Sequence, residues 1–348
     1  MSMRPRFLPL PTALSLSLAI SLSLAGGLSA ADAAFTIQKT GSGGLVIQHE
    51  GKPFAEYVVD QGNKPYLAPV FGPTGKQMTR SYPMKTVDGE QHDHPHHRGI
   101  CFGLEDTAGF DTWAEKATFE EQLKNPKQAE KAKARLAALG AIKHREYKEI
   151  KGGDKSAVVT AVSDILDVNG RKLMEEQHTI TFSATADTRV IDFDIDFIAS
   201  EGPVKLGDKK DSGFSIRVPT SMAVKNGLGT PGGTIINSEG VKDTDAWAKR
   251  AKWCDYSGPV EGETLGVAML NHPSSFRYPT PWHVRDYGLF TANPFGIQSL
   301  DKTQADGTVE LKKDEHLKLR HRLIFHKGDA KSASIESAWE AYSKEDRK

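Results

Sequence analysis

The sequence predicts an all-β, mainly antiparallel protein folded as a large β-sandwich, with one helical insertion near residues 116–139. Three observations predict this fold class. Short apolar runs recur along the chain with turn residues between them. One segment alternates strictly between apolar and acidic side chains, which is typical of a half-buried antiparallel strand. Glutamate, lysine, glutamine and alanine concentrate in a single stretch, which indicates a helix.

The first strands are expected soon after the amino terminus. Phe35–Lys39 and Leu45–His49 flank a Gly-Ser-Gly-Gly turn signal at 41–44. The turn residues 50–52 then lead into a third apolar run at 54–59. These patterns predict three short strands.

The clearest strand pattern lies between residues 157 and 199. Runs 157–162 and 165–168 precede Asn169-Gly170, the preferred residue pair of a type I′ hairpin, and strand 172–182 follows. In the next strand, 190–199, apolar and acidic side chains face opposite sides of the sheet: Ile191, Phe193, Ile195 and Phe197 against Asp192, Asp194 and Asp196. The aspartate row is either a solvated outer face or a site for calcium or a polar ligand.

The helical stretch is 119–139, where Asn125-Pro126 is expected to split it and Gly140 to cap its end. Its polar composition predicts a surface insertion between strands. Further strand-like runs follow at 215–218, 234–236, 264–270 and 317–325. Because no long linker interrupts the pattern, residues 35–348 are expected to form a single domain.

Residues 1–34 match a secretory signal peptide. Arg4 and Arg6 precede an uncharged Leu/Ser-rich stretch at 13–25, and small residues follow. The alternative is a membrane anchor, but the apolar run is short for a bilayer. We therefore expect a periplasmic or extracellular protein, in which a Cys101–Cys254 disulfide can form if the two residues lie close enough.

The charge balance bears on the class of partner. The chain has 45 Lys and Arg residues and 45 Asp and Glu residues, a formal net charge of zero. A nucleic-acid-binding protein needs a clustered positive excess to displace counterions, so this class is not expected. Two cysteines are also too few for a four-cysteine zinc site.

A first cluster of candidate functional residues is rich in histidine. Four of the twelve histidines fall within residues 92–97, and an Arg-Gly pair follows them. In an extended segment, side chains two residues apart share a face, so His92, His94 and His96 are expected to project together, opposite His97. These imidazoles can ligate a transition metal or supply an acid and a base near neutral pH. A surface loop with locally bonded histidines is the third interpretation.

A second cluster spans residues 271–288, where three prolines restrict the backbone. It contains two histidines, two arginines, Trp282, two tyrosines and Asp286. Aromatic rings beside Arg and Asp suit a sugar, which offers an apolar face for stacking and hydroxyls for hydrogen bonds. The alternative is a well-packed loop around a buried Trp282.

Four segments carry a resemblance to a known family: 94–99 (HPHHRG), 237–240 (NSEG), 253–259 (WCDYSGP) and 281–296 (PWHVRDYGLFTANPFG). At these residues the chain resembles the PmoA-like family of exported bacterial β-sandwich proteins, a domain of unknown function often labelled methane oxygenase. The resemblance covers about residues 36–330. It implies a sandwich like the galactose-mutarotase-type supersandwiches and a role in carbohydrate breakdown. No spanning segment follows residue 34, so a membrane methane monooxygenase is not expected.

The lead hypothesis is an exported carbohydrate-active enzyme, a hydrolase, lyase or epimerase-like protein, in which the two clusters face one cleft. His97 and His283 are the expected acid and base, and Asp286 is expected to orient a histidine. The expected substrate-binding residues, to which the resemblance contributes His144 and Asp255, are Arg98, His144, Asp255, Trp282 and Arg285. The partner expected from this hypothesis is a small-molecule or oligosaccharide substrate.

Two alternatives remain open. The first is a cupin-like metalloenzyme holding a divalent transition metal through His94 and His96 with His272 or His283. The second is a non-catalytic carbohydrate-binding protein with a shallow aromatic strip instead of a histidine-lined pocket.

Overall fold

The structure, a computed structural model, describes Met1 and residues 33–346. The predicted signal peptide, residues 1–34, lies almost entirely outside the described residues and stays a prediction. Within residues 33–346, no helix combines the length and the apolar character that a membrane crossing needs.

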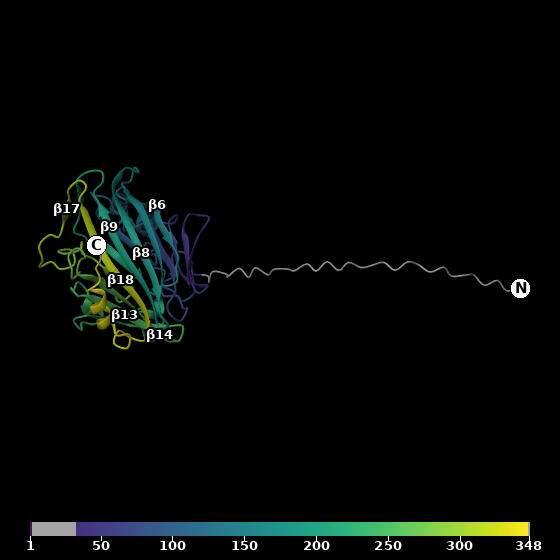
Figure 1. Cartoon of the computed structure of the whole chain (residues 1–348). Helices are drawn as coiled ribbons and strands as arrows, with labels where there is room; N and C mark the ends of the chain where they lie inside the picture. Colours follow the sequence, from purple (N-terminus) through teal and green to yellow (C-terminus); the bar gives the residue numbers. More distant parts are fainter. Residues whose placement is uncertain (2–32, 347–348) are drawn as a thin grey trace. The chain divides into compact units, whose positions relative to one another are not determined.

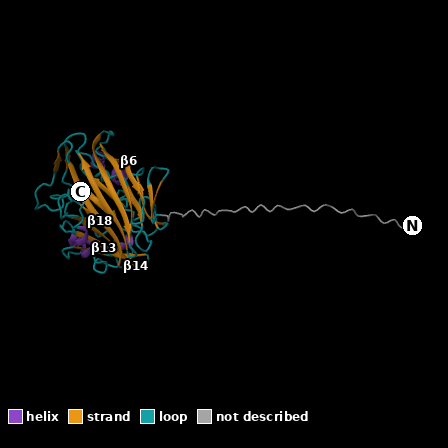
Figure 2. Ribbon diagram, viewed as in Figure 1, coloured by secondary structure: helices purple, strands orange, loops and turns teal. Residues whose placement is uncertain are grey.

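Two eight-stranded antiparallel sheets make up the body of the domain, as predicted (Figures 1 and 2). The first sheet consists, in spatial order, of β1 (Phe35–Lys39), β2 (Leu45–His49), β3 (Lys52–Val58), β4 (Tyr66–Val70), β5 (Ile100–Leu104), β11 (Ser212–Arg217), β16 (Leu289–Ala292) and β15 (Trp282–Val284). The second consists of β12 (Thr234–Asn237), β13 (Trp253–Val260), β14 (Glu263–Asn271), β18 (His316–Lys327), β9 (Thr188–Ile198), β8 (Lys172–Ala184), β7 (Ser156–Leu166) and β6 (Ala141–Lys151).

Shorter elements complete the described part of the chain. They are the ribbon of β10 (Val204–Leu206) and β17 (Val309–Leu311), the helices α1 (Lys116–Lys124), α2 (Ala129–Leu136) and α3 (Ile335–Tyr342), and the 3-10 turns η1 (Thr220–Met222) and η2 (Asp243–Ala246). Figure 1 looks onto the second sheet, where β8, β9, β18, β14 and β13 run side by side.

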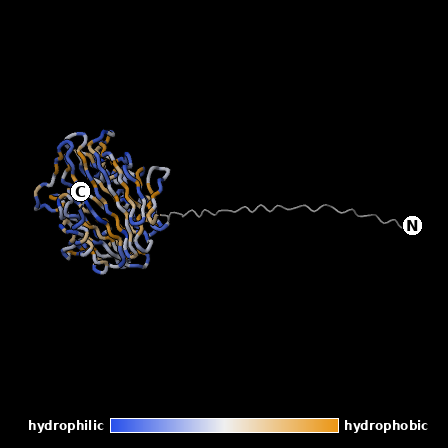
Figure 3. Tube along the Cα trace, viewed as in Figure 1, coloured by the Kyte–Doolittle hydropathy of each residue, from blue (hydrophilic) through white to orange (hydrophobic). Residues whose placement is uncertain are grey.

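The hydrophobic core lies between the two sheets, because alternate residues of each strand point inward. In β9, Ile191, Phe193, Ile195 and Phe197 are buried in this core. Figure 3 shows the same separation, with apolar stretches along the strands and hydrophilic stretches in the surrounding loops.

The aspartates of β9 lie on the outer face, where they meet basic side chains of the neighbouring β18. Asp192 pairs with Arg322 at 2.6 Å, Asp194 with Arg320 at 3.2 Å, and Asp196 with His316 at 2.9 Å. The row therefore forms cross-strand ion pairs.

The hairpin between β7 and β8 differs from the predicted type I′ turn. Gly170 has a positive φ of 80°, but Asn169 does not, whereas a type I′ turn needs both. The loop is closed instead by Asp167, whose carboxylate accepts hydrogen bonds from the backbone N–H groups of Asn169 and Arg171 at 2.9 Å. A side chain that bonds the backbone locally has replaced the two-residue turn.

The helical insertion is split where the sequence predicts. Asn125, with extended backbone angles, ends α1, and α2 begins at Ala129. A capping box starts α1, since Glu115 N–H donates to Thr118 Oγ1 at 3.0 Å and the Glu115 side chain accepts from the Thr118 N–H.

The outward face of the first sheet carries the polar residues that matter below. Phe214 and Ile216 of β11 and Trp282 and Val284 of β15 point into the core. The residues that alternate with them, including Arg217 and His283, therefore point outward.

Candidate active site

A pocket of about 350 Å³ lies on the outward side of the first sheet. Its lining comes from the 71–99 loop, the insertion and the residues just before it, the residues just before β11, and β15 with the turn after it: His94, His96, His97, Trp113, Ala114, Thr118, Arg135, Lys210, Asp211, His283, Arg285 and Tyr287. The two sequence clusters thus contribute to a single pocket, through the first cluster's histidines and through His283 and Arg285.

The first cluster is not extended, contrary to the expectation from sequence. His94 has a positive φ of 45°, and the His97 N–H donates to the His94 carbonyl at 3.0 Å, so residues 94–97 form a turn. Gly99 permits this path, because a Cβ there would lie 2.2 Å from the Leu67 carbonyl oxygen. The turn sends His94, His96 and His97 into the pocket, whereas His92 stacks on Tyr82.

A charge network lies beneath this turn, in which Arg80 and Arg217 are buried and Asp93 is half-buried. Asp93 bonds to the guanidinium groups of Arg80 and Arg217 and accepts from His94 Nδ1 at 2.7 Å. Burial alone raises the pKa of Asp93, but the His94 hydrogen bond and the two guanidinium charges outweigh it and hold that pKa well below its usual range. Asp93 is therefore ionised and fixes two cations in place.

His97 has its tautomer set by this network. Arg217 can only donate, so its contact with His97 Nδ1 at 3.1 Å requires Nδ1 to be the acceptor. Burial, followed by the charges of His96 and Arg217, lowers the pKa of His97 well below its usual value. A neutral His97 then carries its proton on Nε2 and acts as a hydrogen-bond donor.

His283 has the opposite tautomer. Its Nδ1 donates to the Lys210 carbonyl at 2.6 Å, and Asn293 Nδ2 donates to the same oxygen at 2.9 Å. Burial lowers the pKa of His283 to about 4, so near neutral pH it is uncharged and Nε2 carries a lone pair. One pocket therefore contains a donor Nε2–H on His97 and an acceptor Nε2 on His283.

Arg285 lies between two aromatic rings at the pocket wall. Its guanidinium carbon is 4.7 Å from the ring centroid of Trp247 and 5.3 Å from that of Tyr287. Trp247 also packs edge-on against His283, with ring centroids 4.6 Å apart. Burial raises the pKa of Tyr287 to about 12, so its hydroxyl stays protonated. The wall offers fixed donors beside flat apolar surfaces, an arrangement suited to a sugar.

The insertion and the segment just before it supply residues that sequence analysis did not single out. Thr118 Oγ1 bonds to His96 Nδ1 at 2.9 Å, and the Trp113 ring lies 5.7 Å from that of His97. Arg135 of α2 pairs with Asp111 at 2.6 Å while it lines the pocket. Trp247 and Arg217 were also missed as site residues, because a lone aromatic or arginine gives no signal in a single sequence. Tyr287 belongs to the second predicted cluster but was not assigned a role.

Two predicted site residues serve other purposes. Arg98 forms a bidentate pair of hydrogen bonds to Glu115, at 2.8 and 2.9 Å. It therefore connects the histidine turn to the start of α1 and does not line the pocket. Asp286 pairs with Lys225 at 2.8 Å and contacts no histidine. The group that orients His283 is the Lys210 carbonyl, which the sequence does not reveal.

Three further predicted substrate-binding residues lie away from the pocket. Trp282 is fully buried in the core and donates to the Ala251 carbonyl, as the alternative interpretation of that segment expected. Asp255 is buried against His326 on the outer face of the second sheet, at 2.7 Å. His144 lies in β6, where its ring packs 4.1 Å from Tyr147. The strand and the face on which each residue lies depend on strand pairing and register, which the sequence does not specify. In all three cases that position is away from the pocket.

The predicted metal site is not assembled. His272 bonds to Ser274 and the Glu345 carbonyl and packs on Tyr342, so it does not join His94 and His96 in the pocket. In the part of the chain that the structure describes, no group of three or more His, Cys, Asp or Glu side chains is arranged to hold a metal ion. The donor set present thus does not fit the metal that the cupin-like alternative requires. Cys101 and Cys254 are both buried free thiols, not a disulfide.

Comparison with models of protein families identifies the family to which the chain belongs. Residues 44–340 match the model of a family of unknown function, DUF6807, and the chain belongs to that family. The expected membership of the PmoA-like family is therefore wrong. No curated protein matches the sequence.

Solved structures with a similar fold are carbohydrate-active proteins, at low similarity. A GH36 alpha-galactosidase of Geobacillus stearothermophilus is 10% identical, with 84% of this chain and 41% of that chain covered and a TM-score of 0.40. A galactose mutarotase-related enzyme of Lactobacillus acidophilus is 10% identical over 79% of this chain and 95% of that one, with a TM-score of 0.32.

A putative aldose 1-epimerase of Escherichia coli is 13% identical over 55% of this chain and 69% of that one, with a TM-score of 0.29. The chain spans only 28% to 42% of the lengths of the alpha-galactosidases and the heparan sulfate lyase that it matches. The function must therefore be argued from the pocket itself.

Proposed function

We propose that the protein is an exported carbohydrate-active enzyme that transfers a proton on its sugar substrate, as an epimerase or a lyase does. The observation that carries this proposal is the pair of opposite tautomers, His97 with Nε2–H and His283 with a free Nε2, in one pocket. A volume of about 350 Å³ lies within the range of small-ligand pockets.

In the proposed step, His283 Nε2 takes a proton from the substrate, and negative charge develops on a neighbouring substrate oxygen. The His97 Nε2–H and the Arg285 guanidinium donate to that oxygen, which lowers the energy of the charged state. Delivery of a proton from water to the opposite face, with loss of the His283 proton to solvent, gives an epimer. In a lyase reaction the group on the adjacent carbon leaves with the bonding electron pair and takes the proton held by His283, which gives an unsaturated product.

Hydrolysis is less well supported by the lining residues. Most glycoside hydrolases use two carboxyl groups, one as acid and one as base or nucleophile. Among the described residues, Asp211 is the single carboxylate that lines the pocket, and it pairs with Lys210 at 2.7 Å.

The experiment is a substrate screen in D₂O with the mature protein. Neutral and acidic oligosaccharides are incubated with enzyme, and NMR follows deuterium entering carbon-bound positions while ultraviolet absorbance follows unsaturated products. Proton transfer predicts one of these signals and its loss in His283→Ala. Release of reducing ends without either signal would indicate hydrolysis, and binding without any turnover would indicate a carbohydrate-binding protein; either result overturns the proposal.

A further inference from the structure

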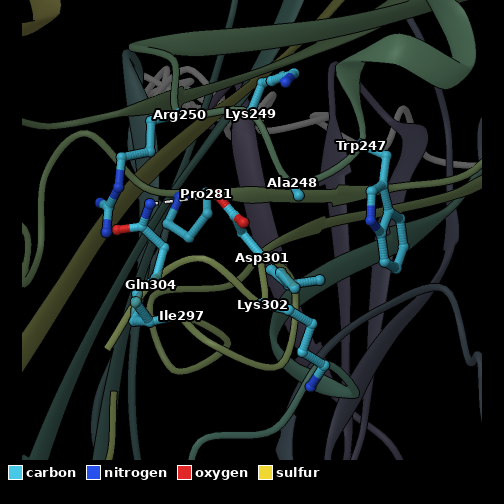
Figure 4. A pocket seen from close by; sticks show the side chains of 10 residues that line it. Trp247, Ala248, Lys249, Arg250, Pro281, Ile297, Asp301, Lys302 and Gln304 are labelled. Carbon is cyan, nitrogen blue, oxygen red and sulfur yellow. Dashed lines mark hydrogen bonds between the residues drawn. The ribbon is translucent and has the colours of Figure 1, made fainter. Parts of the chain in front are cut away.

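A second pocket, of about 530 Å³, adjoins the histidine pocket and has a different character. We call it the basic pocket. Figure 4 shows Lys249, Arg250 and Lys302 spread around it, with Trp247 at one side. Its lining residues are Trp247, Ala248, Lys249, Arg250, Pro281, Ile297, Leu300, Asp301, Lys302 and Gln304.

Trp247 connects the two pockets. It lines the basic pocket, and its ring also contacts His283 at 4.6 Å and the Arg285 guanidinium at 4.7 Å, both residues of the histidine pocket. The segment that carries Trp247 runs beside β15, since Ala248 N–H donates to the Trp282 carbonyl and Trp282 N–H donates to the Lys249 carbonyl. A ligand of two or more sugar units can therefore contact both pockets across this ring.

The cations of the basic pocket have no direct ion-pair partner in the described chain, although the Asp301 carboxylate interacts with Lys249 through space and Arg250 donates to two backbone carbonyls. No ion pair within residues 33–346 involves Lys249, Arg250 or Lys302. The one carboxylate in the lining, Asp301, is occupied by its own turn: it accepts from the Thr303 N–H at 3.0 Å, from Thr303 Oγ1 at 2.7 Å and from Gln304 Nε2 at 3.3 Å.

An excess of positive charge lines these two pockets, although Lys210 pairs with Asp211 and Arg135 with Asp111. Together they are lined by six Lys and Arg side chains and two carboxylates, although the whole chain has no formal net charge. Lys302 also borders a third hollow, of about 280 Å³, where three lysines are matched by Asp106, Asp208 and Asp306. A local cationic excess of this kind raises the local concentration of an anionic ligand.

From this arrangement we infer that the substrate is an anionic oligosaccharide. The reacting sugar occupies the histidine pocket, and a carboxylate or sulfate group on the adjoining unit occupies the basic pocket, held by Lys249 and Lys302 with Trp247 between the two units. This inference rests on the proposed function for the reacting unit, but it assigns a separate binding site.

The electrostatics of the histidine pocket agree with this assignment. Burial, together with the charges of Lys210 and Arg285, favours the neutral form of His283 against the opposing effect of Asp211. A substrate anion held in the adjoining basic pocket adds negative charge beyond Trp247 and favours the protonated imidazole that forms when His283 accepts a proton. A neutral substrate supplies no such compensation.

The test measures binding separately from turnover. Calorimetry at low and high salt compares an oligogalacturonate, its methyl-esterified form of equal length, and a sulfated galacto-oligosaccharide. The variant Lys249→Gln/Lys302→Gln is compared with Lys312→Gln/Lys313→Gln, which removes the same charge from exposed positions outside both pockets. Circular dichroism confirms that both variants are folded.

We expect wild-type protein to bind at least one of the two anionic ligands about tenfold or more tightly than the ester, with an advantage that falls with salt. Tighter binding of the uronate or of the sulfate identifies which anion the site takes. The pocket variant is expected to lose this preference and the control variant to keep it. Equal affinity for ester and anions, or equal loss in both variants, overturns the subsite. Anion-selective binding without turnover overturns the proposed function alone, and turnover of neutral sugars without anion preference overturns the subsite alone.

Discussion

The proposed chemistry depends on which ring nitrogen of His97 and of His283 carries the proton. For each imidazole, one neighbouring group determines this. A carbonyl at Lys210 accepts from His283, and a guanidinium at Arg217 donates to His97, so the two imidazoles expose opposite Nε2 functions. Both partners are buried or part of the backbone, which makes the tautomers a property of the fold and not of the ligand.

His283→Ala removes the proposed base. We expect kcat to fall by about 10²- to 10⁴-fold with a much smaller change in substrate affinity, since a general base acts mainly in the transition state. Steady-state kinetics and calorimetry on the substrate found by screening give the two values. An unchanged kcat would remove His283 from the mechanism.

Two substitutions at His97 distinguish a hydrogen-bond donor from a general acid that transfers its proton. If the neutral Nε2–H only donates a hydrogen bond, His97→Gln keeps an N–H donor and retains at least about tenfold more activity than His97→Ala, which loses about 10²- to 10³-fold. The readout is kcat for the two variants. Equal losses would show that His97 must transfer a proton, which contradicts the donor role.

At the scale of elements, the sequence predicted strands well because alternation reports burial directly. In β9 the apolar residues enter the core and the aspartates face outward, as the period of two requires. The β7–β8 turn was mispredicted because the Asp167 carboxylate, two residues before Asn169, accepts hydrogen bonds from the loop backbone and closes the loop in another way. The insertion was predicted, but the contributions of Arg135 and of Trp113, just before the insertion, to the pocket were not.

The candidate site was partly predictable for a similar reason. The unusual density of histidine in one segment, and of histidine, arginine and aromatic residues in another, identified two segments that line one pocket. The roles of Arg98, Asp255 and Asp286 depend on partners far away in sequence, namely Glu115, His326 and Lys225. Such pairs follow from register and loop path, which one sequence does not specify.

One glycine in β14 yields an element-scale prediction. His326 of β18 reaches across Gly266 to bond Asp255 of β13, and a Cβ at 266 would lie 2.3 Å from His326 Cε1. Gly266→Ala must therefore displace the ring and separate a buried pair, and we expect a loss of about 1–3 kcal/mol in unfolding free energy.

Urea denaturation measures the effect of this change, with Gly202→Ala as the control. A Cβ at 202 meets no atom within 4 Å, so we expect a change of less than about 0.5 kcal/mol there. Equal stabilities of the two variants would show that the His326 ring does not depend on the space above Gly266.

At the scale of the molecule, buried neutral histidines make stability depend on pH. His96, His97, His283 and His321 are each at most 7% exposed, and burial lowers the pKa of all four, to about 4 for His283 and about 3 for His321. Their contribution is complete above the unfolded pKa of about 6.5. As the pH falls below this value, the unfolded chain binds protons that the folded chain does not bind, so the free energy of unfolding decreases.

The range from about pH 6.5 to 5 isolates these histidines, because unfolded carboxyl groups titrate mainly below it. Each histidine that stays neutral lowers the unfolding free energy by up to about 2 kcal/mol over that range. His321→Gln removes one such group from the core, whereas His92→Gln removes an exposed histidine. Urea denaturation across the range is expected to show a shallower pH slope for His321→Gln, by about one proton, with His92→Gln as the control for loss of an exposed imidazole. Identical slopes in all three proteins would mean that His321 is protonated in the folded state, and the assignment of neutral core histidines would then have to be abandoned for that position.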